Sequence, residues 1–183
     1  FDPRVRASAA HVLLNHGVEL EIPTEAALER VRASDQELPT LGVLLRLGDA
    51  DAYDEIRTRL QRESGTSEDN TRLTALLRQA AYAQPSLLPE VRGFANRGNM
   101  AAVDAWIQMG GPLDELILGR GHYALMLQRL DASHWREAMP MIIDGIRYAS
   151  PPYQRVHYFG HLERMIDGTG PEDRVGWLKA VDS

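Results

Sequence analysis

The chain has 183 residues and no cysteine, and its 20 basic and 26 acidic side chains give a net charge of −6. This length is typical of one domain, and the lack of cysteine excludes disulfides, thiolate catalysis and thiolate zinc sites. The acidic balance argues against nucleic acid as a partner, because binding to phosphates depends on clustered positive charge. The sequence shows neither a run of about 18 apolar residues nor the pattern of a signal peptide, so we expect a soluble protein without a membrane partner.

Cap and turn residues predict three helices in the first 48 residues. Asp2 followed by Pro3 is typical of a helix start, and Gly17 can take the left-handed conformation that ends a helix. Four apolar residues of this helix repeat at helical spacing: Val5, Ala9, Val12 and Leu13. Periodicity identifies such a stripe without saying whether it meets the core or a partner. By similar signals a second helix opens at Thr24, and a third extends from Pro39 to Gly48.

Four further helices are predicted up to residue 111. The first, which Asp49 or Asp51 can cap, should leave its arginines in water: Arg57, Arg59 and Arg62. The next covers 67–83, where Pro85 prevents continuation. Ser86 caps the third, and Asn99 starts the fourth, which ends at Gly110 and Gly111.

The remaining residues predict short helices after Pro112, around Tyr123, after Ser133, after Ser150 and after Pro171. Pro140 lies about two turns into one of them, so we expect residues 141–149 to form a separate helix. The helix after Ser150 should turn four residues inward: Val156, Phe159, Leu162 and Met165. No segment shows the alternation typical of strands. The sequence therefore predicts an all-α fold of about a dozen short antiparallel helices.

Parts of the sequence resemble helical repeats. The first helix, with Asp2-Pro3, Val5-Arg6, Ala9-Ala10 and Leu13, is similar to the second helix of a HEAT-type repeat, and Leu47-Gly48-Asp49-Ala50 resembles a junction between two such repeats. Gly98-Asn99 and the stretch 121–125 are partly similar to ankyrin repeats. The resemblance implies stacked helix pairs that bind proteins on an extended surface, either as an irregular HEAT-like solenoid or as a two-lobed helical bundle.

We expect residues 1–183 to form a single all-helical domain with possible lobes 1–110 and 111–183. Because the chain starts at Phe1 and enters a helix at once, we also expect it to be part of a longer bacterial protein.

Candidate catalytic chemistry is sparse, because the common motifs for phosphate binding, serine hydrolysis and zinc proteolysis are absent from the sequence. His157 and His161 share one helix face at a spacing that suits a metal ion, but no third candidate ligand lies at a spacing typical of metal sites. We therefore interpret one histidine as packed in the core and the other as exposed to solvent. Asp114-Glu115 and Glu68-Asp69 lie in predicted first helical turns, where negative charge stabilises the helix dipole. We therefore expect no cofactor and no metal.

The second half of the chain is rich in the residue types that favour protein interfaces. Eight of the 12 aromatic residues lie from Trp106 onward, and tyrosines surround the turn Ser150-Pro151-Pro152. The alternative is an aromatic core. If a contact surface exists, it should include these tyrosines, a nearby arginine and residues of the Gly119–His122 loop: Tyr148, Tyr153, Arg155, Tyr158, Gly119, Arg120 and His122. The alternative for the loop is an ordinary connection between two helices.

These observations favour a protein-protein interaction domain that binds a protein partner. The alternative hypothesis is a cysteine-independent ubiquitin ligase domain of a secreted bacterial effector, which would act by docking a ubiquitin-conjugating enzyme. It depends on lysine scarcity: Lys179 is the single lysine among the 20 basic residues, and arginine cannot accept ubiquitin. A GC-rich coding sequence explains the same bias. The protein would be cytoplasmic in the first case and secreted into a host cell in the second.

Overall fold

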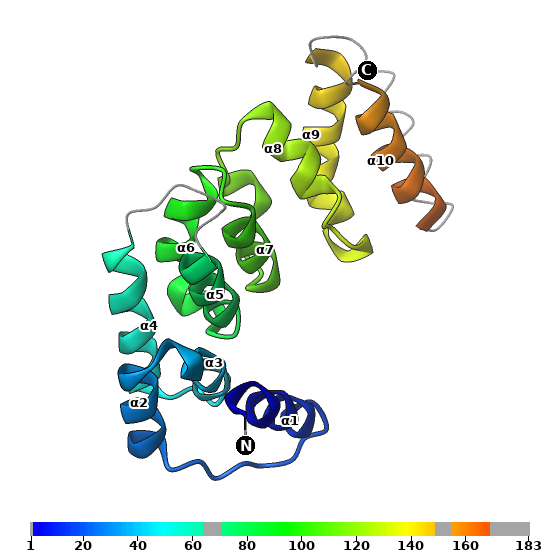
Figure 1. Cartoon of the computed structure of the whole chain (residues 1–183). Coiled ribbons are helices and arrows are strands. Elements are labelled where there is room, and N and C mark those ends of the chain that lie inside the picture. The colour runs from blue at the N-terminus through cyan, green and yellow to red at the C-terminus, as the bar shows by residue number, and fades with distance from the viewer. Residues whose placement is uncertain (1, 64–70, 149–154, 169–183) are drawn as a thin grey trace. The chain divides into compact units, whose positions relative to one another are not determined.

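The computed structural model describes residues 2–63, 71–148 and 155–168, and this part of the chain contains helices and no β-strand (Figure 1). The predicted all-α fold is confirmed, but the described residues form ten α-helices rather than about a dozen. The α-helices are α1 (Pro3–Asn15), α2 (Thr24–Ala33), α3 (Leu38–Arg46), α4 (Ala50–Arg62), α5 (Thr71–Ala80), α6 (Leu88–Ala95), α7 (Met100–Gln108), α8 (Arg120–Leu127), α9 (Trp135–Tyr148) and α10 (Arg155–Gly168). Short 3-10 turns are η1 (Asp35–Glu37), η2 (Gln84–Leu87), η3 (Leu113–Glu115) and η4 (Ala132–His134).

The chain divides into two compact units, Phe1–Gly111 and Pro112–Ser183, which we call unit 1 and unit 2. Unit 1 holds α1 to α7, and unit 2 holds α8 to α10. A single domain with possible lobes 1–110 and 111–183 stays a prediction.

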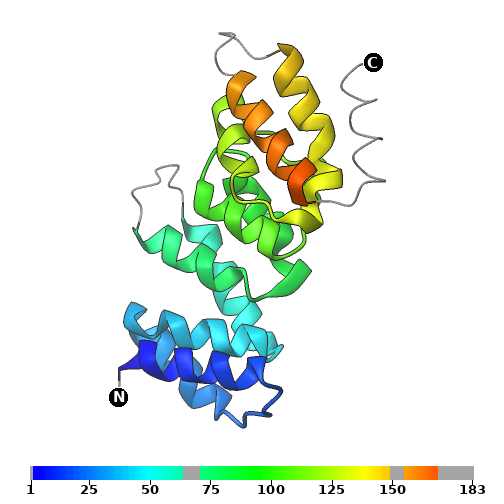
Figure 2. The ribbon, with the colours of Figure 1, turned by 90° about the vertical axis from the view of Figure 1, so that its right-hand side faces the viewer.

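In unit 1 the odd-numbered helices follow one another in contact: α1 packs on α3, α3 on α5, and α5 on α7 (Figures 1 and 2). The even-numbered helices α2, α4 and α6 each pack against the next helix in the chain. The middle helix α3 touches α1, α2, α4 and α5, which explains why it is apolar nearly all round, with Leu38, Leu41, Val43, Leu44 and Leu45 buried.

The same junction occurs twice in unit 1. Gly48 follows the end of α3 and has a φ of 78°. The carboxylate of Asp49 then accepts a hydrogen bond from the Ala52 backbone N–H at 2.8 Å. Asn99 caps α7 in the same way, through the Ala102 N–H at 3.1 Å. A left-handed glycine followed by a side-chain cap turns the chain sharply and starts the next helix. The start predicted at Asn99 is confirmed, and of the two caps that the sequence allows for α4, Asp49 and Asp51, the structure uses Asp49.

The apolar stripe of α1 that the sequence shows lies on the exposed side of the helix. Val5 and Val12 are 58% and 54% exposed, and Leu13 is exposed as well, while Ala7 is the buried residue of α1. The helix carries apolar residues on two faces, and the face with the smaller side chain packs against α3. Periodicity alone could not select between the two stripes.

The prediction that Arg59 stays in water is also wrong, because this side chain is 7% exposed. Its guanidinium donates to Glu55 at 2.6 Å, to Asp35 at 3.1 Å and to the Val31 carbonyl at 2.7 Å. Arg59 therefore fastens α4 to α2 and η1. Helical position placed it on the polar side of α4, and Glu55 lies on the same helix, but Asp35 and the Val31 carbonyl belong to segments that only the fold brings to Arg59.

In unit 2, α9 runs without interruption through Pro140, so the predicted separate helix at 141–149 is wrong. Proline removes one backbone hydrogen bond, at a cost of about 3 kcal/mol in a helix interior. Buried residues on both sides of Pro140, namely Ala138, Met139 and Ile142, hold the helix by packing, and Pro140 itself lies on the exposed side.

Candidate binding surface

The ends of α9 and α10 bring together two of the predicted contact residues. Tyr148 is the last residue of α9 and is 64% exposed, and Arg155 is the exposed first residue of α10. The Arg155 guanidinium reaches the Arg147 carbonyl at 3.5 Å, so the start of α10 lies beside the end of α9. Tyr153 and the turn Ser150-Pro151-Pro152 lie outside the described residues.

Tyr158 is a core residue rather than a surface residue. It is 6% exposed, and its ring packs directly over Gly145 of α9, where even one added methyl group would meet the ring. Glycine at 145 thus lets α9 and α10 approach closely. For Tyr158 the alternative interpretation, an aromatic core, is the one that agrees with its burial.

The predicted loop 119–122 is the start of α8. Gly119 is the exposed residue before the helix, and its carbonyl accepts from the His122 N–H at 2.9 Å. His122 is half-buried, and the side chain of Arg120 lies outside what the structure describes. The hydrogen bond is that of an ordinary first helical turn, and α8 itself packs on α9 and α10.

Two exposed apolar residues of α10 were missed by the sequence analysis, which placed them in the core. Val156 is 68% exposed and Phe159 is 44% exposed, three positions apart on one helix face. The buried face is formed by Tyr158 and His161 together with Leu162, which was predicted to face inward. Those three residues have the same helical spacing, so a second inward stripe was present in the sequence. We call Tyr148, Arg155, Val156 and Phe159 the α10 surface.

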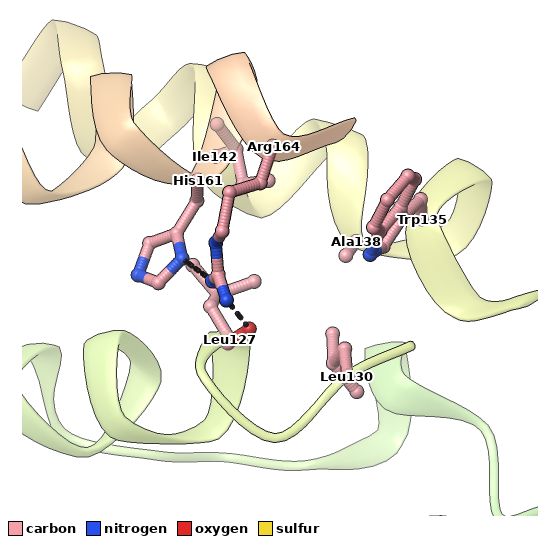
Figure 3. Close-up of a pocket in the computed structure, with 7 residues that line it drawn as sticks. All are labelled: Leu127, Leu130, Trp135, Ala138, Ile142, His161 and Arg164. Carbon is pink, nitrogen blue, oxygen red and sulfur yellow. Dashed lines mark hydrogen bonds between the residues drawn. The ribbon is translucent and has the colours of Figure 1, made fainter. Parts of the chain in front are cut away.

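His161 and Arg164 anchor α10 on the end of α8 (Figure 3). The Arg164 guanidinium lies against Nδ1 of His161 and reaches the Leu127 carbonyl at 3.5 Å. Burial, and then the charges of Arg164 and His157, lower the pKa of His161, although a hydrogen bond with the backbone of Ala124 opposes them. The ring is therefore neutral at pH 7, so that its Nδ1 can accept from Arg164.

The space beside this pair is too small for a ligand. The cavity measures about 10 Å³ and is lined by Leu127, Leu130, Trp135, Ala138, Ile142, His161 and Arg164 (Figure 3). A cavity must offer at least about 10–15 Å³ to hold one water molecule. His161 is buried and His157 exposed, as interpreted from the sequence, and the described residues contain no group of three or more potential metal ligands. This pair has the geometry of a structural contact between helices.

The predicted acidic pairs have no shared site. Asp114 and Glu115 lie exposed in the first turn of η3, and Glu68-Asp69 lies outside the described residues. Glu137 of α9 accepts a hydrogen bond from the Leu113 N–H, which fastens η3 to α9.

Across the residues that the structure describes, no helix combines the length and the apolar character needed to cross a membrane. No protein-family model, no curated protein and no solved structure matches the chain.

Proposed function

We propose that this chain is a protein-protein interaction domain that binds a protein partner through the α10 surface. The observation that carries the proposal is the exposure of Val156 and Phe159 next to Arg155 on α10, with Tyr148 at the end of α9. Exposed aromatic and aliphatic side chains together with arginine are the composition that favours the centre of a protein interface.

The scaffold that we propose is an irregular helical repeat of the HEAT or ankyrin kind. Support comes from unit 1, where α1, α3, α5 and α7 pack in series and where α2, α4 and α6 each pair with the following helix. Contacts between every second helix are expected when helix pairs stack in two layers. Stacked pairs present long surfaces of side chains, which such proteins use to bind other proteins.

A protein partner agrees with the charge better than a nucleic acid does. The net charge of −6 repels a phosphate backbone, and two of the four members of the α10 surface are hydrocarbon side chains. Contact with a protein would bury those two side chains and leave Arg155 and the Tyr148 hydroxyl at the polar margin.

Photocrosslinking tests the proposal. A benzoylphenylalanine residue is placed at position 148 or 159 of the full-length protein in its native cells, with position 128, which is exposed on the same unit, as the control. We expect positions 148 and 159 to give the same discrete protein adduct and position 128 to give none. Val156→Asp should remove the adduct without changing the thermal midpoint, because Val156 is exposed.

Once the adduct has been identified and purified, Arg155→Ala should weaken binding by about 1–3 kcal/mol. Adducts that do not differ between position 128 and the α10 surface, or that survive Val156→Asp, would contradict the proposal.

A further inference from the structure

Unit 1 contains a second feature that the proposed function does not use, a cavity beneath α1. It measures about 150 Å³ and lies between α1, the connection to α2, and the helices α2 and α3. Its walls are mainly hydrocarbon, with arginine side chains from α1 and α2: Arg6, Ala7, Ala10, Ile22, Arg30, Thr40 and Val43.

The volume limits what can enter. An apolar cavity of about 150 Å³ is large enough to take up benzene, whereas pockets for cofactors and drug-sized ligands measure about 300–1,000 Å³. A nucleotide or a larger cofactor would therefore extend beyond the cavity. A group of about six carbon atoms is the size that the cavity accepts.

The charges beside the cavity are unbalanced. Glu37 of η1 is the acidic partner of both arginines, at 2.7 Å from Arg6 and 3.8 Å from Arg30. The Glu37 carboxylate also accepts a hydrogen bond from the Thr40 hydroxyl at 2.7 Å. Two guanidinium groups thus share one carboxylate, and one positive charge is left in excess.

The carboxylate and the two arginines differ in their access to solvent. The Glu37 side chain is 12% exposed, while those of Arg6 and Arg30 are 45% and 50% exposed. Burial raises the pKa of Glu37, but Thr40, Arg6 and Arg30 together lower it below its ordinary value, so Glu37 is ionised at neutral pH. The arginines can reach an added anion without leaving Glu37, since each guanidinium has five N–H donors.

We propose that this cavity is a binding site for a small organic acid with a branched or aromatic apolar group of about six carbons. The apolar group lies against Ala7, Ala10 and Val43, and the carboxylate pairs with Arg6 and Arg30. Arginine suits this role because its planar donors match a carboxylate. The excess positive charge selects an acid over a neutral compound of the same shape. This site is in unit 1, so it is independent of the α10 surface.

Benzoate and benzamide are the probes that test the site, because they share a ring and differ in charge. The full chain is titrated with each, and the methyl resonances of Ala7, Ala10 and Val43 are followed by NMR. We expect saturable shifts at these methyl groups with benzoate, and binding weaker by about tenfold or more with benzamide.

Variants separate the charge from the cavity. Arg30→Gln should weaken benzoate binding by about tenfold, because the side chain is half exposed and its loss leaves the fold intact. Arg32→Gln is the matched control: Arg32 is also on α2 and half exposed, but it pairs with Glu55 away from the cavity, so binding should stay within about twofold. Ala10→Leu should abolish binding by filling the cavity.

Two outcomes would overturn the proposal. One is the absence of saturable shifts at the cavity methyl groups with benzoate. The other is equal binding of benzoate and benzamide, or equal effects of Arg30→Gln and Arg32→Gln, either of which would show that charge does not select the ligand. Crosslinking through the α10 surface is measured separately, so failure of one proposal leaves the other open to its own test.

Discussion

Replacing Arg59 by alanine removes the buried cation that joins three segments of unit 1. The substitution leaves the Val31 carbonyl without the Arg59 donor at 2.7 Å and deprives Glu55 and Asp35 of the same guanidinium. Glu55 keeps a second partner, Arg32 at 3.3 Å, and Asp35 is half exposed to water. The loss should therefore fall below that of a fully buried ion pair.

The expected magnitude follows from these contacts. Breaking a fully buried pair costs about 3–5 kcal/mol, and leaving one buried polar group without a partner costs about 1–3 kcal/mol. Because two of the three acceptors retain water or another arginine, we expect Arg59→Ala to lower the free energy of unfolding of unit 1 by about 2–3 kcal/mol. With a urea m-value of about 1–3 kcal/mol/M, the midpoint falls by about 0.7–3 M.

Urea unfolding followed by tryptophan fluorescence measures this loss. The substitutions Trp135→Phe and Trp177→Phe leave Trp106, which is buried in unit 1, as the single fluorescent tryptophan. Arg62→Ala is the matched control, since Arg62 is an exposed arginine on the same helix. A midpoint for Arg59→Ala that equals that of Arg62→Ala would refute the reasoning.

The pH dependence gives a second check on the same network. Burial raises the pKa of Glu55, but hydrogen bonds and charge from Arg59 and Arg32 lower it below its ordinary value. A lowered carboxyl pKa contributes stability above the unfolded pKa of about 4.3, and this stability is lost as the pH falls through the folded value. The difference between the original chain and Arg59→Ala should therefore shrink below about pH 4.

Two further predictions concern unit 2. Gly145→Ala should lower the free energy of unfolding by about 1–3 kcal/mol, and the thermal midpoint with it, because the added methyl group meets the Tyr158 ring. Gly160→Ala adds a methyl group that meets open space in the same unit, so it should be neutral or slightly stabilising. Equal midpoints for the two variants would contradict the close contact of α9 with α10. Burial and then Arg164 lower the pKa of His161, so its neutral ring contributes stability above the unfolded pKa of about 6.5. The free energy of unfolding should consequently fall as the pH drops through and below this value, and it should fall less in His161→Gln.

The local signals in the sequence determined the class of the fold and many helix ends. Asp2, Asp49 and Asn99 each accept a hydrogen bond from a backbone N–H of the helix that follows. Caps and left-handed glycines act within four or five residues of chain, so their effect does not depend on distant segments. The exposure of Tyr148 and Arg155 also agrees with their selection as surface candidates.

The tertiary structure decided which face of each helix is buried. Both α1 and α10 carry two apolar stripes, and the inward one is the stripe with a matching neighbour: Ala7 against α3, and Tyr158 over Gly145. Arg59 is buried because α2 and η1 bring the Val31 carbonyl and Asp35 to its guanidinium, beside Glu55 of its own helix. Helical periodicity describes one helix at a time, whereas burial depends on the shape and chemistry of the partner helix, which the periodicity of a single segment does not contain.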